Sequence, residues 1–309
     1  MSTKISIIGA AGTLGSCTAY RLATEGLADE LVMFDVNRNM LKSHIMDLQI
    51  AVAGLQNVDI REGHAEDLAD SDIVINNAGA PWRVVSSRME KLQENLTIVE
   101  EWAEKITTYC PAAVVITSTN PVDPLNLAMH RFSGLDRKKL LGYTLNDSTR
   151  FVHFAAQALD VQTTRVKGSV IGEHGDYAVL LFSSLRLDGK PVSVDNAMQA
   201  DIRSRHRNYL KSAIGLGTGW TSGWASSIGL AAMVSAITAK TGAPIPCSVL
   251  LEGEYGFDGI CMSVPAELSL DGVRKIIEVE LTPDEKNALE ESAAYLQGIT
   301  AQMEKNIKK

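Results

Sequence analysis

A histidine between glycines and acids is the first candidate for chemistry in this sequence: residues 172–176 read Gly-Glu-His-Gly-Asp. An imidazole changes its charge near neutral pH, and a carboxylate partner can orient it for proton transfer. Of two arginines, Arg88 and Arg150, one could polarise a carbonyl group and the other could bind a carboxylate through two parallel hydrogen bonds. With Asp147 and the segment 120–123, Asn-Pro-Val-Asp, these are the groups needed to oxidise a 2-hydroxy acid.

The N-terminal residues could supply the site for a hydride acceptor. The apolar run 5–8 leads into residues 9–15, Gly-Ala-Ala-Gly-Thr-Leu-Gly, and a helical pattern follows at 17–23. Glycines permit a tight turn and let backbone N–H groups approach a pyrophosphate at the start of the helix. On its own, such a turn is equally consistent with an ordinary connection between a strand and a helix. The residues expected to bind the cofactor here are Gly9, Gly12, Thr13, Leu14 and Gly15.

An acidic residue at the end of the next apolar run favours the cofactor interpretation. Residues 30–35 end in Asp35, which lies 20 positions after Gly15. A carboxylate at this point can bind both hydroxyls of an adenosine ribose and repel a 2′-phosphate. We therefore expect NAD rather than NADP.

Composition narrows the class of protein. A chain of 309 residues, 45% hydrophobic and 21% charged, is long enough for two packed globular domains. The net charge of −8 argues against nucleic-acid or membrane partners, which would require a basic surface. The four cysteines lack metal-ligand spacing, so no metal site is expected. With no apolar run of about 18 residues and no signal segment, a cytoplasmic location is expected.

The elements expected to position these residues change in kind near residue 143. Before it, strands and helices alternate, which predicts a Rossmann-type doubly wound parallel sheet with its ligand at the carboxyl ends of the strands. After it, the pattern predicts an α+β domain that contains hairpins. We therefore expect an NAD-binding domain at 1–143 and a substrate-binding, catalytic domain at 144–309. The expected strands are 4–8, 30–35, 72–76, 113–117, 139–141, 166–171, 180–187, 261–267 and 273–279; the expected helices include 148–159, 195–214, 222–241 and one that starts at 282–285.

The order of these motifs resembles the lactate/malate dehydrogenase family of NAD-dependent L-2-hydroxy-acid dehydrogenases, and the resemblance covers the chain from the glycine turn to the last helix. The glycine turn is more like the malate branch, and residues 172–176 are more like the lactate branch. The motifs run in the order glycine turn, Asp35, Ala78-Gly79, Arg88, Asn120-Pro121, Asp147, Arg150 and His174.

The resemblance implies a role for each candidate residue. His174 would act as the general base in oxidation, and Asp147 would orient its ring and stabilise the imidazolium. Arg150 would bind the substrate carboxylate, and Arg88 would reach the reacting oxygen from a mobile loop. Asn120 would lie near the substrate and the nicotinamide, and its bond to the following proline is a candidate for a cis peptide. Further cofactor contacts are implied for Ala78, Gly79, Asn95, Thr119 and Asn120.

Each catalytic candidate also has a structural interpretation. His174 could be a buried structural histidine, and Asp147 could cap a helix that begins at the next residue. Arg88 and Arg150 could be surface charges on helices. A non-catalytic NAD-binding descendant of the family is a further alternative, which the loss of any of these residues would have favoured; all are present.

Residues 76–79, Asn-Asn-Ala-Gly, also match a signature of short-chain dehydrogenases. That class requires a Tyr-x-x-x-Lys pair. None of the seven tyrosines is followed by lysine four positions later, so we reject this class.

The substrate is less clear than the reaction. In the family that the chain resembles, malate enzymes place an arginine, and lactate enzymes a glutamine, six residues before the loop arginine; here that position holds Trp82. A strict count therefore favours a lactate-like monocarboxylic acid with Trp82 as an apolar wall. A shift of one residue would instead direct Arg83 at a second carboxylate, and malate/oxaloacetate is the alternative. Ser222 is expected on the opposite wall of the pocket.

Two apolar helical stretches, 222–239 and 40–53, predict assembly of the chain. They are similar to surfaces that this family buries between subunits, so we expect a homodimer or homotetramer. The alternative is that both stretches pack only within one chain.

Overall fold

The computed structural model describes residues 2–80, 88–219, 221–239 and 243–307. Within these ranges, one 12-stranded sheet has the order β3-β2-β1-β4-β5-β6-β10-β11-β7-β8-β9, with β12 paired to β11. Its strands are β1 (Lys4–Ile8), β2 (Glu30–Phe34), β3 (Asp59–Glu62), β4 (Ile73–Asn76), β5 (Val114–Thr117), β6 (Leu140–Gly142), β7 (Val166–Gly172), β8 (Ala178–Leu187), β9 (Lys190–Pro191), β10 (Ile245–Glu252), β11 (Asp258–Ser269) and β12 (Gly272–Ile276). The helices are α1 (Thr13–Thr24), α2 (Arg38–Val52), α3 (Arg88–Tyr109), α4 (Val122–Ser133), α5 (Leu145–Ala158), α6 (Asn196–Gly215), α7 (Gly223–Ala239) and α8 (Pro283–Ile307).

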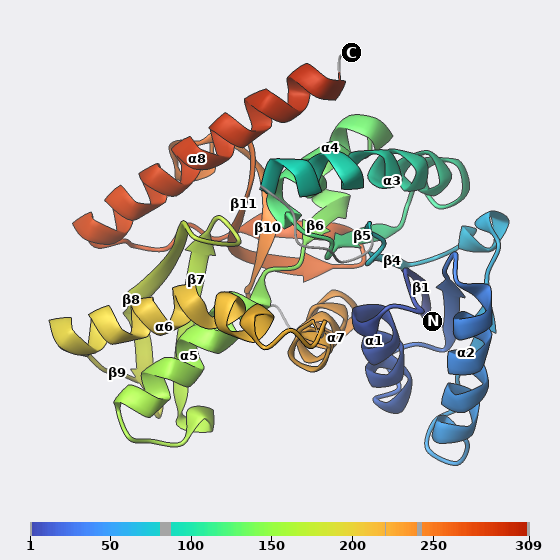
Figure 1. Ribbon diagram of the computed structural model, residues 1–309, viewed down its shortest axis with the longest axis horizontal. Helices are drawn as coiled ribbons and strands as arrows, with labels where there is room; N and C mark the ends of the chain where they lie inside the picture. The colour runs from blue at the N-terminus through green and yellow to red at the C-terminus, as the bar shows by residue number, and fades with distance from the viewer. Residues whose placement is uncertain (1, 81–87, 220, 240–242, 308–309) are drawn as a thin grey trace.

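The N-terminal half is the parallel part of the sheet. β1 pairs in parallel with β2 and β4, and the parallel pairing continues to β3 on one side and to β5 and β6 on the other. Side chains alternate between two apolar cores: Ile5 and Ile7 pack with residues of α1, α2 and α7, whereas Ile8 packs with residues of α3 and α4. Figure 1 shows these two groups of helices on opposite sides of the strands. The predicted doubly wound α/β sheet is confirmed.

One strand of this half is absent from the sequence prediction. β3 has the sequence Asp-Ile-Arg-Glu and pairs only with β2, at the edge of the sheet. A short edge strand needs no continuous apolar run, because only one of its sides is covered. Its single large apolar residue, Ile60, is buried.

The C-terminal half continues the same sheet with antiparallel pairs. β10 pairs with β6 through Ser248 and Gly142 and along its length with β11, which in turn meets β7. β7 and β8 pair in antiparallel, as do β8 and β9, so this half contains hairpins, as the sequence predicts. The sequence does not predict β10, because a proline at position 246 argues against a strand. β10 joins the two halves of the sheet.

The starts of two helices bear on the site. α5 begins at Leu145 with Thr144 at the N-cap, so the interpretation of Asp147 as a capping residue is wrong. Asp147 lies in the first turn instead, where the helix dipole stabilises a carboxylate. The last helix begins as predicted: Thr282 Oγ1 accepts the Glu285 N–H (3.3 Å), and Glu285 Oε2 accepts the Thr282 N–H (3.0 Å).

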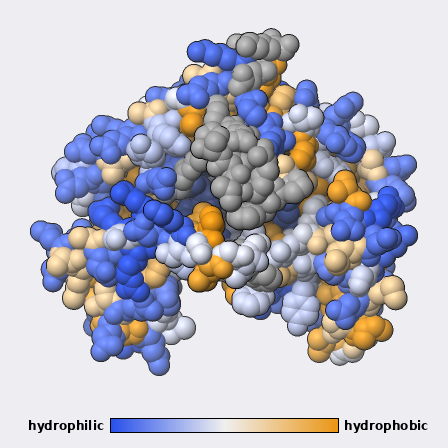
Figure 2. All heavy atoms as spheres, in the orientation of Figure 1, coloured by the Kyte–Doolittle hydropathy of each residue, from blue (hydrophilic) through white to orange (hydrophobic). Residues whose placement is uncertain are grey.

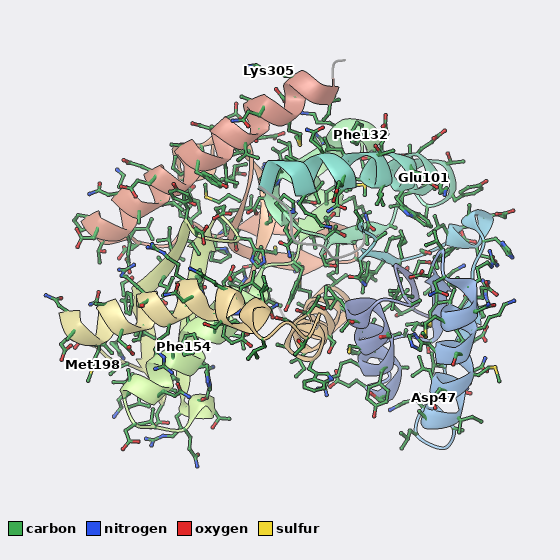
Figure 3. The ribbon with its side chains drawn as sticks, in the orientation of Figure 1. Asp47, Glu101, Phe132, Phe154, Met198 and Lys305 are labelled. Carbon is green, nitrogen blue, oxygen red and sulfur yellow. The ribbon has the colours of Figure 1, made fainter. Side chains whose placement is uncertain are left out.

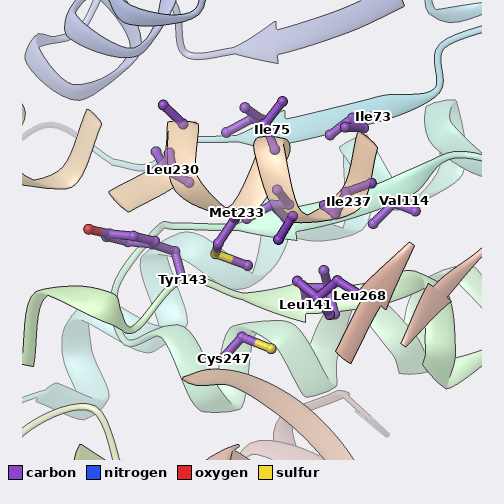
Figure 4. Close-up of a cluster of buried hydrophobic side chains, with 14 of the residues drawn as sticks. Ile73, Ile75, Val114, Leu141, Tyr143, Leu230, Met233, Ile237, Cys247 and Leu268 are labelled. Carbon is purple, nitrogen blue, oxygen red and sulfur yellow. The ribbon is translucent and has the colours of Figure 1, made fainter. Parts of the chain in front are cut away.

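One of the apolar cores contains residues of both halves. Figure 4 shows Met233 and Ile237 of α7 in a cluster that includes Ile75 of β4 and Cys247 of β10. Helix α7 thus packs on strands from both halves of the chain. In the described ranges, no helix combines the length and the apolar character needed to cross a bilayer.

Candidate active site

A histidine and an aspartate from two different elements meet at the centre of the site. β7 ends at Gly172, whose φ of 89° turns the chain so that His174 faces α5. His174 Nδ1 lies 2.6 Å from Asp147 Oδ2, and the two side chains are only 14% and 7% exposed. Since Nδ1 is held by the carboxylate, Nε2 is the ring nitrogen that can exchange a proton with a substrate.

The electrostatics of this pair favour a protonated imidazole. Burial lowers the pKa of His174, but the charge and hydrogen bond of Asp147 outweigh it and hold that pKa above the ordinary value. Burial raises the pKa of Asp147, but the charges of His174, His206 and Arg150 hold it below its ordinary value. The pair can therefore hold a proton near neutral pH and release it to a substrate oxygen.

Helix α6 supports both Asp147 and the neighbouring arginine. Arg150 Nη1 lies 3.4 Å from Asp147 Oδ1, and its guanidinium lies over the Tyr209 ring, 4.7 Å from the ring centre. His206 is buried, and its Nε2 lies 3.1 Å from the Asp147 main-chain oxygen. Burial lowers the pKa of His206. Because a carbonyl oxygen can only accept, Nε2 is the donor of this hydrogen bond. Figure 3 shows Phe154 of α5 between the two helices, where its ring meets that of Tyr209.

Sequence reasoning missed His206 and Tyr209. They stand three positions apart on one face of α6, in a segment whose other residues are mostly charged or polar. This spacing was the only available signal, and it does not identify a partner.

A buried hydrogen-bond chain fixes the start of α5 against α7. The Tyr143 hydroxyl donates to Asn146 Oδ1 (2.9 Å), and Asn146 Nδ2 donates to Ser226 Oγ (2.7 Å). Ser222 is half-buried just before α7, where its carbonyl oxygen accepts the Ser226 N–H at 3.0 Å. The predicted pocket residue Ser222 is thus one turn away from this chain.

At the other end of the site, the predicted glycines pack against main chain. A Cβ on Gly9, whose φ is 75°, would lie 2.9 Å from the Ala78 nitrogen. A Cβ on Gly15 would lie 2.7 Å from Ala10 Cα. The Gly12 N–H donates to the Gly9 carbonyl oxygen at 3.2 Å and closes the turn. Only glycine fits at positions 9 and 15, and the turn leads directly into the N-terminus of α1.

Asp35 connects this turn to the end of β2. Its Oδ2 accepts the Ala11 N–H (2.9 Å), and its Oδ1 accepts the Asn37 N–H (2.8 Å). Each oxygen keeps a second lone pair for a ribose hydroxyl. Thr13 and Leu14 form the first turn of α1, and both are half-buried.

The remaining cofactor candidates surround residues 78–80, which follow β4. Thr119 Oγ1 donates to the Ala78 carbonyl oxygen at 2.6 Å, close to Gly79. Asn95 is buried; its Oδ1 accepts the Ala80 N–H (2.7 Å) and its Nδ2 donates to the Asn120 carbonyl oxygen (2.8 Å). The peptide bond between Asn120 and Pro121 is cis, as predicted.

These contacts fit a bound dinucleotide. Gly9 and Gly15 leave no room for a Cβ, and the turn places N–H groups at the start of α1, where a pyrophosphate is stabilised. The Asp35 carboxylate lies beside that turn, at the expected place for the adenosine ribose. The residues that would hold NAD are those of the turn, Asp35 and the segment 78–80.

Three predicted site residues are not located by these contacts. Trp82 and Arg83 lie outside the described residues. Arg88 is the first residue of α3, but its side chain is also outside the description. Among the described residues, no three His, Cys, Asp or Glu side chains form a group that could hold a metal ion.

Comparison with known proteins identifies the family. The NAD-binding domain of lactate/malate dehydrogenases matches residues 3–142, and the α/β C-terminal domain of the same family matches residues 144–307. A malate dehydrogenase of Halobacterium salinarum is 36% identical over 301 residues, which cover 95% of this chain and 97% of the relative. An L-lactate dehydrogenase of Clostridium perfringens is 31% identical over 313 residues, 98% of each chain.

Solved structures of two dehydrogenases are also similar to this chain. The lactate dehydrogenase of Cryptosporidium parvum, in complex with lactic acid and NAD, matches with a TM-score of 0.93 at 30% identity over 98% of each chain. A malate dehydrogenase from the same organism matches with a TM-score of 0.93 at 29% identity over 99% of this chain and 100% of that chain. The chain therefore belongs to the lactate/malate dehydrogenase family, and it is an NAD-dependent dehydrogenase that interconverts 2-hydroxy and 2-keto acids.

Proposed function

We propose that His174 is the proton donor and acceptor of an L-2-hydroxy-acid dehydrogenase, with Asp147 as the group that orients it. The observation that carries this proposal is the 2.6 Å hydrogen bond between His174 Nδ1 and Asp147 Oδ2 in a buried site. Arg150, beside this pair, binds the substrate carboxylate. Arg88 polarises the reacting oxygen.

The proposed roles account for both directions of the reaction. In oxidation, His174 Nε2 accepts the hydroxyl proton while the hydride leaves C2 of the substrate. When bound, NAD supplies the acceptor of that hydride. In reduction, the protonated imidazole donates to the developing alkoxide, and Asp147 stabilises the imidazolium before transfer.

A panel of keto acids tests the reaction class. We expect the purified protein to oxidise NADH when one of pyruvate, oxaloacetate, 2-ketoisocaproate or phenylpyruvate is added. A protein that binds NADH but turns over none of a wide panel of 2-keto acids would support the non-catalytic alternative.

For the substrate, we propose a monocarboxylic 2-keto acid. The support is the strict count, which gives the selecting position to Trp82. Trp82→Gln should then change the ranking among monocarboxylic keto acids of different size, and Arg83→Ala should change little.

Malate/oxaloacetate is the second candidate, because the Halobacterium salinarum relative is named malate dehydrogenase. In that case Arg83→Ala removes one partner of a desolvated charge pair, at a cost of roughly 2–5 kcal/mol for a dicarboxylic substrate. Efficiency with oxaloacetate would fall about 30-fold to several-thousand-fold, while pyruvate would be unaffected.

We also propose that Asp35 selects NAD over NADP. The support is its carboxylate beside the glycine turn, where a 2′-phosphate would be repelled. The wild-type protein should use NADH clearly better than NADPH, and Asp35→Ser should narrow this difference between the two cofactors. A wild-type preference for NADPH would rule this assignment out.

We propose that the chain assembles as a homodimer or homotetramer. A groove of about 440 Å³ lies between α1, α2 and α7, and its rim carries Tyr20, Trp224 and Ile228, whose exposures are 56%, 72% and 55%. Figure 3 labels Asp47 of α2, another residue of this groove. Further apolar surface lies over α2 at the lower right of Figure 2. Ile50 of this helix is exposed.

Solution mass tests this assembly. Light scattering at micromolar concentration should give at least twice the chain mass of 33.4 kDa. Ile228→Asp should lower the mass, whereas Tyr109→Asp, a similar change at the end of α3, should not. A wild-type monomer would refute the proposal.

The domain boundary and the location of the protein are further proposals. We place the boundary between the NAD-binding and catalytic parts at residue 143, supported by the family matches on either side. All four cysteines are free, which suits a reducing cytoplasm. Fluorescence microscopy of the tagged protein tests the location.

A further inference from the structure

A second buried carboxylate contacts the loop that carries His174. Asp123 lies in the first turn of α4, two residues after the cis proline, and is 2% exposed. Its Oδ2 accepts the His174 main-chain N–H at 2.8 Å. Asp147 binds the ring of the same histidine from α5. The histidine is thus held by one carboxylate at its main chain and by another at its ring.

Other contacts fasten the same loop. Ser292 of α8 accepts the Glu173 N–H at 2.7 Å, and Glu173 Oε2 accepts the Tyr177 N–H at 2.9 Å. Among the main-chain hydrogen bonds of this loop in the described residues, the one from Asp123 is made to His174 itself. A movement of Asp123 would therefore shift the main chain that carries the imidazole.

The surroundings of Asp123 shield its charge from water. A cavity of about 20 Å³, the size of a single water molecule, is lined by Asp123, Glu173, His174 and, from α8, Tyr295. The Ser248 side chain of β10 also faces this carboxylate and lowers its pKa. In such an environment a carboxylate acts strongly on a neighbouring imidazole.

Asp123 and His174 influence each other's protonation. Burial raises the pKa of Asp123 to about 7, the nearby charge of Glu173 raises it too, and His174 lowers it. In turn, the negative charge of Asp123 raises the pKa of His174. The other polar or titratable groups facing Asp123 are Ser248 of β10 and Cys261 of β11.

We propose that Asp123 is a positioning residue for His174: it fixes the main chain at His174 from α4, and its negative charge stabilises the protonated imidazole. This inference rests on the proposed role of His174. Asp123 does not touch the reacting atoms and acts only through the histidine.

Two substitutions separate these contributions. Asp123→Asn keeps an oxygen that can accept the His174 N–H but removes the charge. Asp123→Ala removes both and leaves a buried N–H without a partner. Glu285→Gln is the matched control, because it neutralises another buried carboxylate that accepts main-chain N–H groups, those of Ser183 and Thr282, away from the loop.

The first readout is the pH dependence of kcat for keto-acid reduction. For Asp123→Asn, the pH at which reduction is half lost should move down, since less negative charge remains to keep the imidazole protonated. Its kcat at the optimum should fall only a few-fold. Asp123→Ala should lower kcat by roughly 10- to 100-fold. Glu285→Gln should leave the pH profile in place.

The second readout does not require turnover. The His174 ring can be titrated by NMR in histidine-labelled protein without cofactor, with His174→Gln to assign its signal. Its midpoint should move to lower pH in Asp123→Asn and remain in place in Glu285→Gln. An unchanged midpoint in Asp123→Asn overturns the proposal, even if Asp123→Ala does not fold. If the wild type reduces no keto acid but the His174 midpoint moves in Asp123→Asn, the proposed function fails. The proposed effect of the Asp123 charge on His174 would still hold.

Discussion

The two ends of the candidate site are held by different kinds of contact. The cofactor end comprises the glycine turn, Asp35 and the segment 78–80, and the proton-transfer end comprises His174, Asp147 and Arg150. At the cofactor end, glycines pack against main chain, and the Asp35 and Asn95 side chains bind main-chain groups. At the proton-transfer end, charged side chains bind one another: Asp147 contacts both His174 and Arg150. The first end is determined by shape and the second by charge, so mutations should affect them in different ways.

The largest expected effect concerns the charged end. His174→Ala should lower kcat by at least ~10²-fold, because a positioned acid–base group is lost. NADH affinity should be nearly unchanged, since the glycine turn lies elsewhere. Steady-state rates and a fluorescence titration with NADH measure the two quantities. His153→Ala, an exposed histidine on α5, is the control. Near-normal turnover of His174→Ala would exclude this residue as the proton donor.

Gly15→Ala should give the opposite pattern. The added Cβ would lie 2.7 Å from Ala10 Cα, and such overpacking costs about 1–3 kcal/mol. We expect lower stability in thermal unfolding and NADH affinity reduced by roughly tenfold or more, while the pH midpoint of His174 stays in place. Gly298→Ala, on α8, is the control, because a Cβ there meets nothing within 4 Å. Equal behaviour of the two variants would refute the shape argument.

Asp147→Asn should combine a loss of rate with a shift along the pH axis. Asp147 raises the pKa of His174, so its neutralisation should lower that pKa, and keto-acid reduction, which needs the imidazolium, should be lost at lower pH. At neutral pH we expect the rate of reduction to fall roughly tenfold or more.

The pKa shift of His174 also affects the stability of the folded state. A raised pKa stabilises the folded state below about pH 6.5, the ordinary histidine value, and that stabilisation disappears as the pH rises through the folded-state pKa. The variant should therefore lose more stability in acidic than in alkaline buffer, as chemical denaturation can show.

The smallest effect is expected at the edge of the charged end. Tyr209 is partly exposed, and its ring stacks on the Arg150 guanidinium at 4.7 Å. A stacked cation at an exposed site contributes about 0.5–1 kcal/mol, so Tyr209→Ala should raise KM for the keto acid about 2- to 5-fold with little change in kcat. Tyr209→Phe keeps the ring and should behave like the wild type. A fall in kcat alone would mean that Tyr209 acts on something other than substrate binding.

The same contrast explains what the sequence can predict. The cofactor end is local: residues 9–15 are contiguous, and Asp35 follows at a fixed spacing, so the pattern is visible in the chain. The parallel strands are visible too, because they are continuous apolar runs buried on both faces. The family resemblance extends this to the order of the candidate catalytic residues.

The features that the sequence does not predict depend on contacts between distant segments of the chain. Asp123 meets His174 across 51 positions, and His206 meets the Asp147 main chain across 59. A single polar residue on a helix gives no periodic signal of its partner. The proline at position 246 argues against a strand at β10, and the sequence pattern predicts the start of α5 three residues late, because Thr144 and not Asp147 is the N-cap. The folded arrangement, not the local pattern, determines these features.

The first turns of α7 connect the two ends of the site, so the two halves of the chain are not independent units. Gly223 lies against Thr13 of α1, and three residues later Ser226 anchors Asn146 beside Asp147. One helical turn therefore serves as a spacer between the cofactor end and the proton-transfer end. A fragment cut at residue 143 would lose α7 and expose the apolar face of α1, so the cofactor half is not a self-sufficient unit that can be transplanted alone.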